Sequence, residues 1–227
     1  MCAVSWVNAL GPVHVVDRDR LILASGSPRR RELLARIYPN FSVVPCRLTE
    51  PQRKSDKVEP RDWAQAVAHF KARAVADQHP GRWVLGADTI VACGGAILGK
   101  PRDLGDARAM LELQAQQVSE VITGVCLLRR GGEPRRLAAT AVTKVWMRDD
   151  AGVREEYLDS GDWAGKAGAY GIQDVGDRLV ARIEGSFSNV VGLPLEVVGE
   201  LLGMVGLPVR AATEKKRPER ANPAVAG

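Results

Sequence analysis

Residues 21–34 read LILASGSPRRRELL, and this stretch decides how the chain begins to fold. The apolar run 21–23 predicts a short buried strand, which the Ser-Gly pair at 25–26 interrupts. Ser27 is a favourable helix N-cap, and Pro28 suits the first helical position, where its missing N–H costs nothing. A strand therefore leads through a tight turn directly into a helix.

The turn between this strand and helix has the geometry of an anion-binding site. Backbone N–H groups and the positive end of the helix dipole point into it. Arg29, Arg30 and Arg31 crowd the same helix end, where cations oppose the dipole and a bound anion would reverse that balance. A solvated basic helix start is the alternative that these residues leave open.

Composition places the chain among ordinary globular proteins. It has 227 residues, of which 45% are hydrophobic, enough for a sizeable core. No apolar run reaches the roughly 20 residues of a membrane span, and we see no secretory signal, so no membrane association is expected. The four cysteines are far apart and form no Cys-x-x-Cys pair, which favours reduced thiols in the cytoplasm.

Much of the net charge of +5 belongs to the C-terminal segment. From Arg210 onward, five basic and two acidic residues give +3, which leaves +2 for the rest of the chain. No aromatic residues accompany these charges, so we expect no stable nucleic-acid binding. We expect an N-terminal extension over 1–20, one domain over 21–207 and a basic, disordered tail over 208–227.

Hydrophobic periodicity predicts an α/β fold with a mixed sheet. Strands are expected, besides the first, at 41–44, 83–93, 96–98, 118–128, 137–147 and 179–183. Helices are expected, besides the first, at 62–78, 106–116, 153–158 and 194–202. In the helix at 62–78, the buried face is predicted to consist of Trp63, Val67, Phe70 and Ala74. Lys71 lies at the edge of that face, either as a snorkelling lysine or as a cation directed into a cleft.

Asp88 is a single carboxylate in the middle of the apolar run 83–93. Because an isolated buried carboxylate is costly, Asp88 must be paired, bound to a metal or exposed in a cleft. No basic residue stands within the run, so we predict a catalytic or metal-binding role. Further along, Lys100 completes a Gly-x-x-x-x-Gly-Lys spacing, but Pro101 follows where a phosphate loop needs Ser or Thr, and that motif is rejected.

Glycine is dense between residues 161 and 176, where five glycines occur. Such density predicts a backbone that turns sharply or approaches a ligand closely. The apolar residues Tyr170 and Ile172 are interleaved with them, which favours an ordered loop at a site over a flexible linker.

Several blocks of the chain, in order from about Leu21 to Leu207, resemble the Maf-like nucleotide pyrophosphatases. The shared blocks are ASGSPRR at 24–30, KA at 71–72, ADT at 87–89, GKP at 99–101, KAGAYGIQ at 166–173 and GSFSNVVGLP at 185–194. The resemblance implies an elongated, two-lobed α/β fold with a central cleft, related to the inosine triphosphate pyrophosphatases. It also implies hydrolysis of a nucleoside triphosphate to the monophosphate and pyrophosphate with a divalent cation such as Mg²⁺ or Mn²⁺.

The resemblance also assigns roles to single residues. Asp88 would be the catalytic residue, as general base or as metal ligand, and Glu50 would be a second metal ligand. The residues expected to bind substrate or set its specificity are Ser27, Arg29, Arg30, Lys71, Thr89, Lys100 and Gln173. Two departures from the family pattern are Thr49, where the family has Asp before Glu50, and residues 114–119, where it has Ser-Gly-x-x-His.

Three of these positions point to a substrate class. Arg29, Thr89 and Gln173 match a subgroup that acts on dTTP and UTP, whereas Tyr, Gln and Glu are typical of a subgroup that acts on 7-methyl-GTP. The neutral amide of Gln173 agrees, since it offers a donor and an acceptor to a pyrimidine edge. We expect dTTP and UTP, with 5-modified uridine triphosphates, as substrates. Two alternative functions stay open: a 7-methyl-GTP pyrophosphatase and a nucleotide-binding regulator of septum formation. A homodimer also stays open as the oligomeric state.

Overall fold

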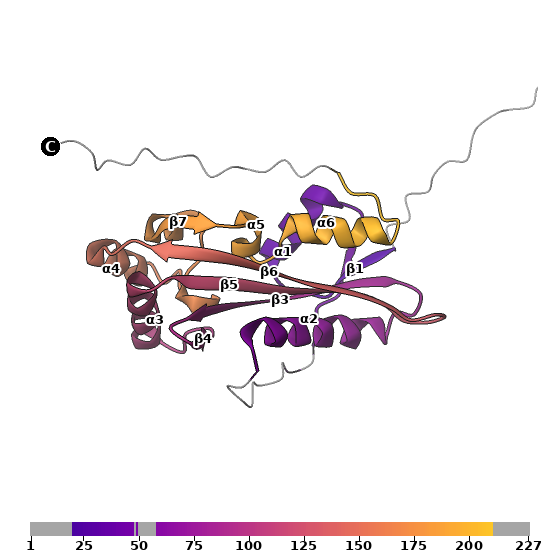
Figure 1. Ribbon diagram of the computed structural model, residues 1–227, viewed down its shortest axis with the longest axis horizontal. Coiled ribbons are helices and arrows are strands. Elements are labelled where there is room, and N and C mark those ends of the chain that lie inside the picture. The colour runs from indigo at the N-terminus through magenta and orange to yellow at the C-terminus, as the bar shows by residue number, and fades with distance from the viewer. Residues whose placement is uncertain (1–19, 48, 50–57, 211–227) are drawn as a thin grey trace, which may run out of the picture.

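One mixed sheet runs through the part of the chain that the computed structural model describes, which is residues 20–47, 49 and 58–210 (Figure 1). Its strands are β1 (Leu21–Leu23), β2 (Ser42–Val43), β3 (Trp83–Cys93), β4 (Ala96–Leu98), β5 (Ser119–Arg129), β6 (Arg135–Met147) and β7 (Val180–Glu184). Their order is β2-β1-β3-β5-β6-β7, with β4 paired to β3. The pairs β1–β2 and β1–β3 are parallel and the others are antiparallel, so the predicted mixed α/β sheet is confirmed.

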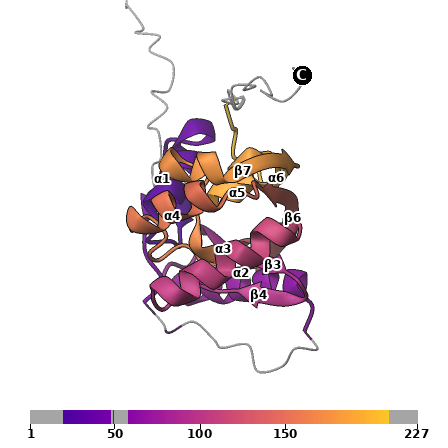
Figure 2. The ribbon, with the colours of Figure 1, turned by 90° about the vertical axis from the view of Figure 1, so that its left-hand side faces the viewer.

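Helices cover both faces of this sheet. They are α1 (Pro28–Ile37), α2 (Pro60–Ala76), α3 (Leu104–Gln116), α4 (Ala151–Asp159), α5 (Phe187–Val191) and α6 (Leu195–Met204), with short 3₁₀ turns η1 (Ala167–Ala169) and η2 (Asp174–Leu179). Figures 1 and 2 show α2 on one face and α1, α5 and α6 on the other. The molecule is elongated along β3, β5 and β6, with α3 and α4 gathered at one end and β1 and α1 toward the other (Figure 1).

The opening strand, turn and helix form as their sequence predicts. The Ser27 side chain caps α1 by accepting a hydrogen bond from the backbone N–H of Arg30 at 3.4 Å. Pro28 is the first helical residue, and Leu33, Leu34 and Ile37 are buried on the inner face of α1. Local signals suffice here because a cap, a proline and an apolar stripe all act within one turn or two.

Helix α2 buries a different face from the predicted one. Of the four residues expected inside, Val67 is buried, whereas Trp63, Phe70 and Ala74 are only partly so. The buried face instead consists of Ala64, Val67, Ala68, Lys71, Ala72, Val75 and Ala76. The prediction was wrong because it placed the largest apolar side chains inside, whereas α2 lies so close to the sheet that alanines make up most of its buried face.

Two glycines, in the neighbouring strands β3 and β5, allow α2 to lie very close to the sheet. A Cβ atom at Gly86 on β3 would lie 2.4 Å from the carbonyl oxygen of Ala68. A Cβ atom at Gly124 on β5 would lie 2.4 Å from the carbonyl oxygen of Ala64. The backbone of α2 therefore rests almost directly on the sheet, which only glycine allows. Because α2 turns its alanine stripe inward, it carries Lys71 inward as well.

The remaining elements follow the predicted order with small shifts at their ends. Helix α5 was not predicted, because five residues are too few to show a helical period. The last helix, predicted over 194–202, runs from Leu195 to Met204. In residues 20–47, 49 and 58–210, the structure contains no helix with both the length and the apolar character needed to cross a membrane.

Candidate active site

The candidate site forms where one edge of β3 is interrupted. Strand β5 pairs with one edge of β3 over Trp83–Ala92. On the other edge, β1 pairs with residues 83–85 and β4 with residues 91–93. No described strand pairs with that edge between these two segments, and a cleft of about 920 Å³ opens there. Asp88 and Thr89 stand in the middle of the interruption.

The cleft brings together the predicted site residues that the structure describes. Its lining includes Ser27, Arg29, Arg30, Lys71, Asp88, Thr89, Lys100 and Gln173. These side chains come from the start of α1, from α2 and β3, from the segment after β4, and from the glycine-rich segment. Glu50, the predicted second metal ligand, lies outside the described residues, as do residues 1–19 and 211–227 of the expected extension and tail.

Asp88 is paired with Lys71 across the interface between β3 and α2. Lys71 Nζ donates a hydrogen bond to Asp88 Oδ1 at 2.7 Å, and both residues are buried. A buried carboxylate needs such compensation, so removing Lys71 would leave the charge of Asp88 without an ion-pair partner among the described residues. The sequence offered Asp88 no basic neighbour within its strand; the inward face of α2 supplies one.

Thr89 points to the opposite face of β3, where it meets Arg30. The Arg30 guanidinium donates from Nη2 to Thr89 Oγ1 at 2.9 Å and from Nε to the carbonyl oxygen of Gly192 at 2.8 Å. Thr89 Oγ1 also lies 2.9 Å from Thr123 Oγ1 on β5. These contacts tie the start of α1 to β3 and to the residue that follows α5. Arg30 and Thr89 therefore hold two walls of the cleft in place through bonds to protein atoms.

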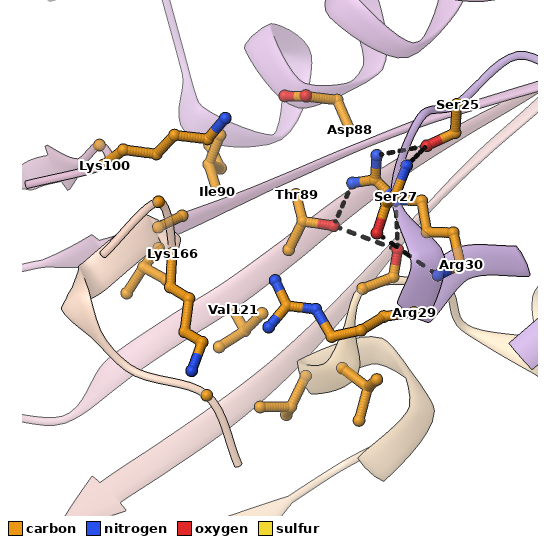
Figure 3. Close-up of a pocket in the computed structure, with 18 of the residues that line it drawn as sticks. Ser25, Ser27, Arg29, Arg30, Asp88, Thr89, Ile90, Lys100, Val121 and Lys166 are labelled. Carbon is orange, nitrogen blue, oxygen red and sulfur yellow. Dashed lines mark hydrogen bonds between the residues drawn. The ribbon is translucent and has the colours of Figure 1, made fainter. Parts of the chain in front are cut away.

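Cations dominate the remaining polar lining of the cleft. Figure 3 shows Arg29, Lys100 and Lys166 approaching it from three different segments. None of the three forms an ion pair with another residue in the described part of the chain. Among the described lining residues, Asp88 is the single carboxylate. Such an excess of positive charge suits a polyanionic ligand.

Sequence reasoning missed Lys166 as a site residue, although it stands in the glycine-rich segment predicted to form a site loop. That segment lines the cleft over residues 164–167 and 170–173. It is held at Gly168, whose N–H donates to the carbonyl oxygen of Gly99 at 3.0 Å and whose carbonyl accepts from Gln114 Nε2 at 2.7 Å. Gly168 has a φ of 70°, and a Cβ atom there would lie 2.9 Å from Val91 Cγ2. The loop is thus tied to the segment after β4 and to α3.

No other described lining residue competes with Asp88 as a proton acceptor at neutral pH. The described lining contains no histidine. Burial raises the pKa of Tyr170, which lines the cleft, and raises that of Tyr157, behind it, to about 12. Since burial favours the neutral form of a phenol, both tyrosines stay protonated at neutral pH. The arrangement therefore offers one carboxylate, supported by a lysine, at the edge of a cationic cleft.

Comparison with known proteins places this site in a family context. The sequence profile described as Maf-like protein matches residues 20–205. A dTTP/UTP pyrophosphatase of Myxococcus xanthus is 44% identical over 194 residues, which covers 85% of this chain and 96% of that protein. A dTTP/UTP pyrophosphatase of Moorella thermoacetica is 45% identical over 193 residues, covering 84% of this chain and 97% of that protein.

One solved structure to which this chain is similar in part is a HAM1 protein from Coxiella burnetii. Its sequence is 16% identical, and the similarity covers 57% of this chain and 73% of that chain with a TM-score of 0.41.

Proposed function

This chain belongs to the Maf-like protein family, and from that premise we propose that it hydrolyses a nucleoside triphosphate to the monophosphate and pyrophosphate. The observation that carries the proposal is the Asp88–Lys71 pair at the edge of a cleft where Arg29, Lys100 and Lys166 form no ion pair with a described residue. The names of the relatives, dTTP/UTP pyrophosphatases at 44–45% identity over most of the chain, support the same reaction.

The chemistry asks for an activated water and for neutralised phosphate charge. Asp88 accepts a proton from a water molecule whose oxygen bonds to the α-phosphorus. The bond from the α-phosphorus to the bridging oxygen breaks, and pyrophosphate leaves with the bonding electron pair. Lys71 positions the Asp88 carboxylate, while Arg29 and Lys100 bind phosphate oxygens. Arg30 and Thr89 shape the wall against which the nucleotide lies.

We propose that a divalent cation such as Mg²⁺ or Mn²⁺ is bound together with the substrate. Lys71 occupies Asp88 Oδ1, and the other carboxylate oxygen accepts no hydrogen bond from a described residue. The described residues contain no group of three or more His, Cys, Asp or Glu that could hold a metal. One carboxylate plus phosphate oxygens is a donor set that Mg²⁺ accepts, and such a cation would neutralise phosphate charge. Glu50 stays the predicted second ligand.

The first test is the identity of the products. Incubation with UTP or dTTP and Mg²⁺ is expected to release monophosphate and pyrophosphate in equal amounts, and excess chelator is expected to abolish the reaction. Ion-exchange chromatography separates the products. Diphosphate with orthophosphate, or full activity in chelator, would contradict the proposal. Tight nucleotide binding without turnover would instead favour the regulator of septum formation.

We propose a preference for dTTP and UTP over 7-methyl-GTP. Gln173 lines the cleft and offers a neutral amide, which pairs with the alternating acceptor and donor edge of a pyrimidine. A Gln173→Glu variant removes the amide donor and adds a negative charge, so kcat/KM for UTP is expected to fall roughly tenfold to a hundredfold. Gln116→Glu on the exposed surface of α3 is the matched control. A higher kcat/KM for 7-methyl-GTP than for UTP in the wild-type protein would overturn this preference.

The nucleotide is the one partner that we propose, and the cytoplasm is the proposed compartment. Cys46, Cys93 and Cys126 are free thiols, as a reducing compartment would keep them. Burial raises the pKa of the Cys126 thiol to about 11, which makes it an unreactive structural side chain.

A further inference from the structure

We propose that Lys166 binds the β- and γ-phosphates of the substrate, the part that leaves as pyrophosphate. The inference rests on the proposed function and extends it to a residue to which the sequence assigned no role. Lys166 immediately precedes η1, lines the cleft and forms no ion pair with any described residue. A lysine side chain that is ordered along a cleft without an acidic partner is suited to an anionic ligand.

The segment that carries Lys166 approaches β3 from the side opposite Asp88. Side chains alternate along a strand, so Thr89 and Val91 share one face of β3 and Asp88 lies on the other. Gly168 packs against Val91, because a Cβ atom added at Gly168 would lie 2.9 Å from Val91 Cγ2. The segment therefore lies on the Thr89 face. In Figure 3, the Arg29 side chain extends from α1 toward the Lys166 side chain.

The geometry of the reaction indicates which part of the substrate Lys166 would contact. The attacking water and the leaving group stand roughly in line on opposite sides of the phosphorus atom. If Asp88 activates the water on its own face of β3, pyrophosphate must depart away from that face. Arg30, on the departing side, is bonded to Thr89 and Gly192. Arg29 and Lys166 are the two cations on that side that form no ion pair with a described residue. Both positive charges then neutralise the part of the substrate where negative charge develops as the bond breaks.

Electrostatics favour the same assignment. Two cations that line one cleft repel each other, and an anion between them removes that repulsion. A neutral pyrimidine base would not do so, whereas the two terminal phosphates carry most of the charge of the triphosphate. Lys166 is thus better explained as a phosphate ligand than as a base-reading residue.

Gly171 leaves the space that the end of Lys166 occupies. A Cβ atom at Gly171 would lie 3.2 Å from Lys166 Cδ, 3.3 Å from Cε and 3.4 Å from Nζ. Gly171 has no positive φ, so alanine is compatible with its backbone and would act mainly by crowding the lysine. This contact provides a second variant that perturbs Lys166 without removing its charge.

The experiment measures binding of inorganic pyrophosphate with Mg²⁺ and, separately, of UMP by titration calorimetry. Lys166→Met is expected to weaken pyrophosphate binding roughly tenfold to a hundredfold, the loss of one charged hydrogen-bonding partner. Binding of UMP should change less than twofold, and Lys166→Arg should restore much of the pyrophosphate affinity. Lys144→Met, at an exposed position on β6, controls for the loss of one positive charge and should match the wild type.

Gly171→Ala alone should weaken pyrophosphate binding. Combined with Lys166→Met in a double variant, it should have little further effect on pyrophosphate affinity. Thermal unfolding checks that each variant is folded. Unchanged pyrophosphate affinity in Lys166→Met, an equal loss of UMP affinity, or a wild-type protein that binds no pyrophosphate would each overturn the inference. Because calorimetry needs no turnover, Lys166-dependent binding without nucleotide hydrolysis would refute the proposed function and leave the Lys166 site standing.

Discussion

Replacing Asp88 with asparagine is expected to lower kcat for UTP at least roughly a hundredfold, because the proton acceptor is lost. The side chain keeps its size, and its amide oxygen still accepts a hydrogen bond from Lys71. The cleft should therefore keep its shape, and KM should change much less than kcat. Steady-state kinetics with UTP and Mg²⁺ measures both quantities.

Stability has to be measured in parallel, since Asp88→Asn removes a buried carboxylate that compensates the positive charge of the Lys71 ammonium. The double variant Asp88→Asn with Lys71→Met removes that charge and should recover stability without recovering turnover. Asp159→Asn, at an exposed position in α4, is the matched control and should be fully active. Near-normal turnover by a folded Asp88→Asn protein would remove Asp88 from the mechanism and leave its pair with Lys71 purely structural.

Gly86→Ala is expected to lower the free energy of unfolding by about 1–3 kcal/mol, the usual cost of overpacking. The new methyl group would lie 2.4 Å from the Ala68 carbonyl oxygen and 2.7 Å from the Ala72 backbone nitrogen. Because these are backbone atoms of α2, the whole helix must move away from β3. For a protein of this size, Tm should fall by about 2–4 °C for each kcal/mol lost. Thermal or urea unfolding provides the measurement.

The same change should also lower activity, because α2 carries Lys71 to Asp88. Gly203→Ala in α6 is the control, since no atom lies within 4 Å of its added Cβ atom and alanine favours a helix. Its stability should be unchanged or higher. If Gly86→Ala were as stable as the wild type, the close approach of α2 would not depend on glycine.

The structure shows what Gln114 does at a position where the sequence departs from the family pattern. The sequence shows only that residues 114–119 lack a Ser-Gly-x-x-His stretch. In the folded chain, buried Gln114 donates to the carbonyl oxygens of Met110 and Gly168. It therefore supports the loop that carries Lys166 by a contact over 54 positions of the chain.

The sequence by itself determined the features that depend on neighbours along the chain. The N-cap Ser27, the following proline and the apolar stripe of α1 predicted the first turn and helix correctly because these signals act locally. Asp88 stood out because a lone carboxylate in an apolar strand is costly wherever that strand lies. The family blocks can also be read one position at a time, and the site residues that they predicted line the cleft wherever the structure describes them, although Lys166 was missed.

The tertiary structure alone decided what those residues do to one another. The Asp88–Lys71 pair depends on which face α2 buries, and that face depends on Gly86 and Gly124 in two separate strands of the sheet. The cleft exists because β1 and β4 pair with separate parts of one edge of β3, a matter of register that no single strand encodes. Lys166 reaches the cleft because the carbonyl of Gly99 and the side chain of Gln114 hold its loop against β3. Contacts between distant segments are specified only when the strands have paired and the helices have packed against them.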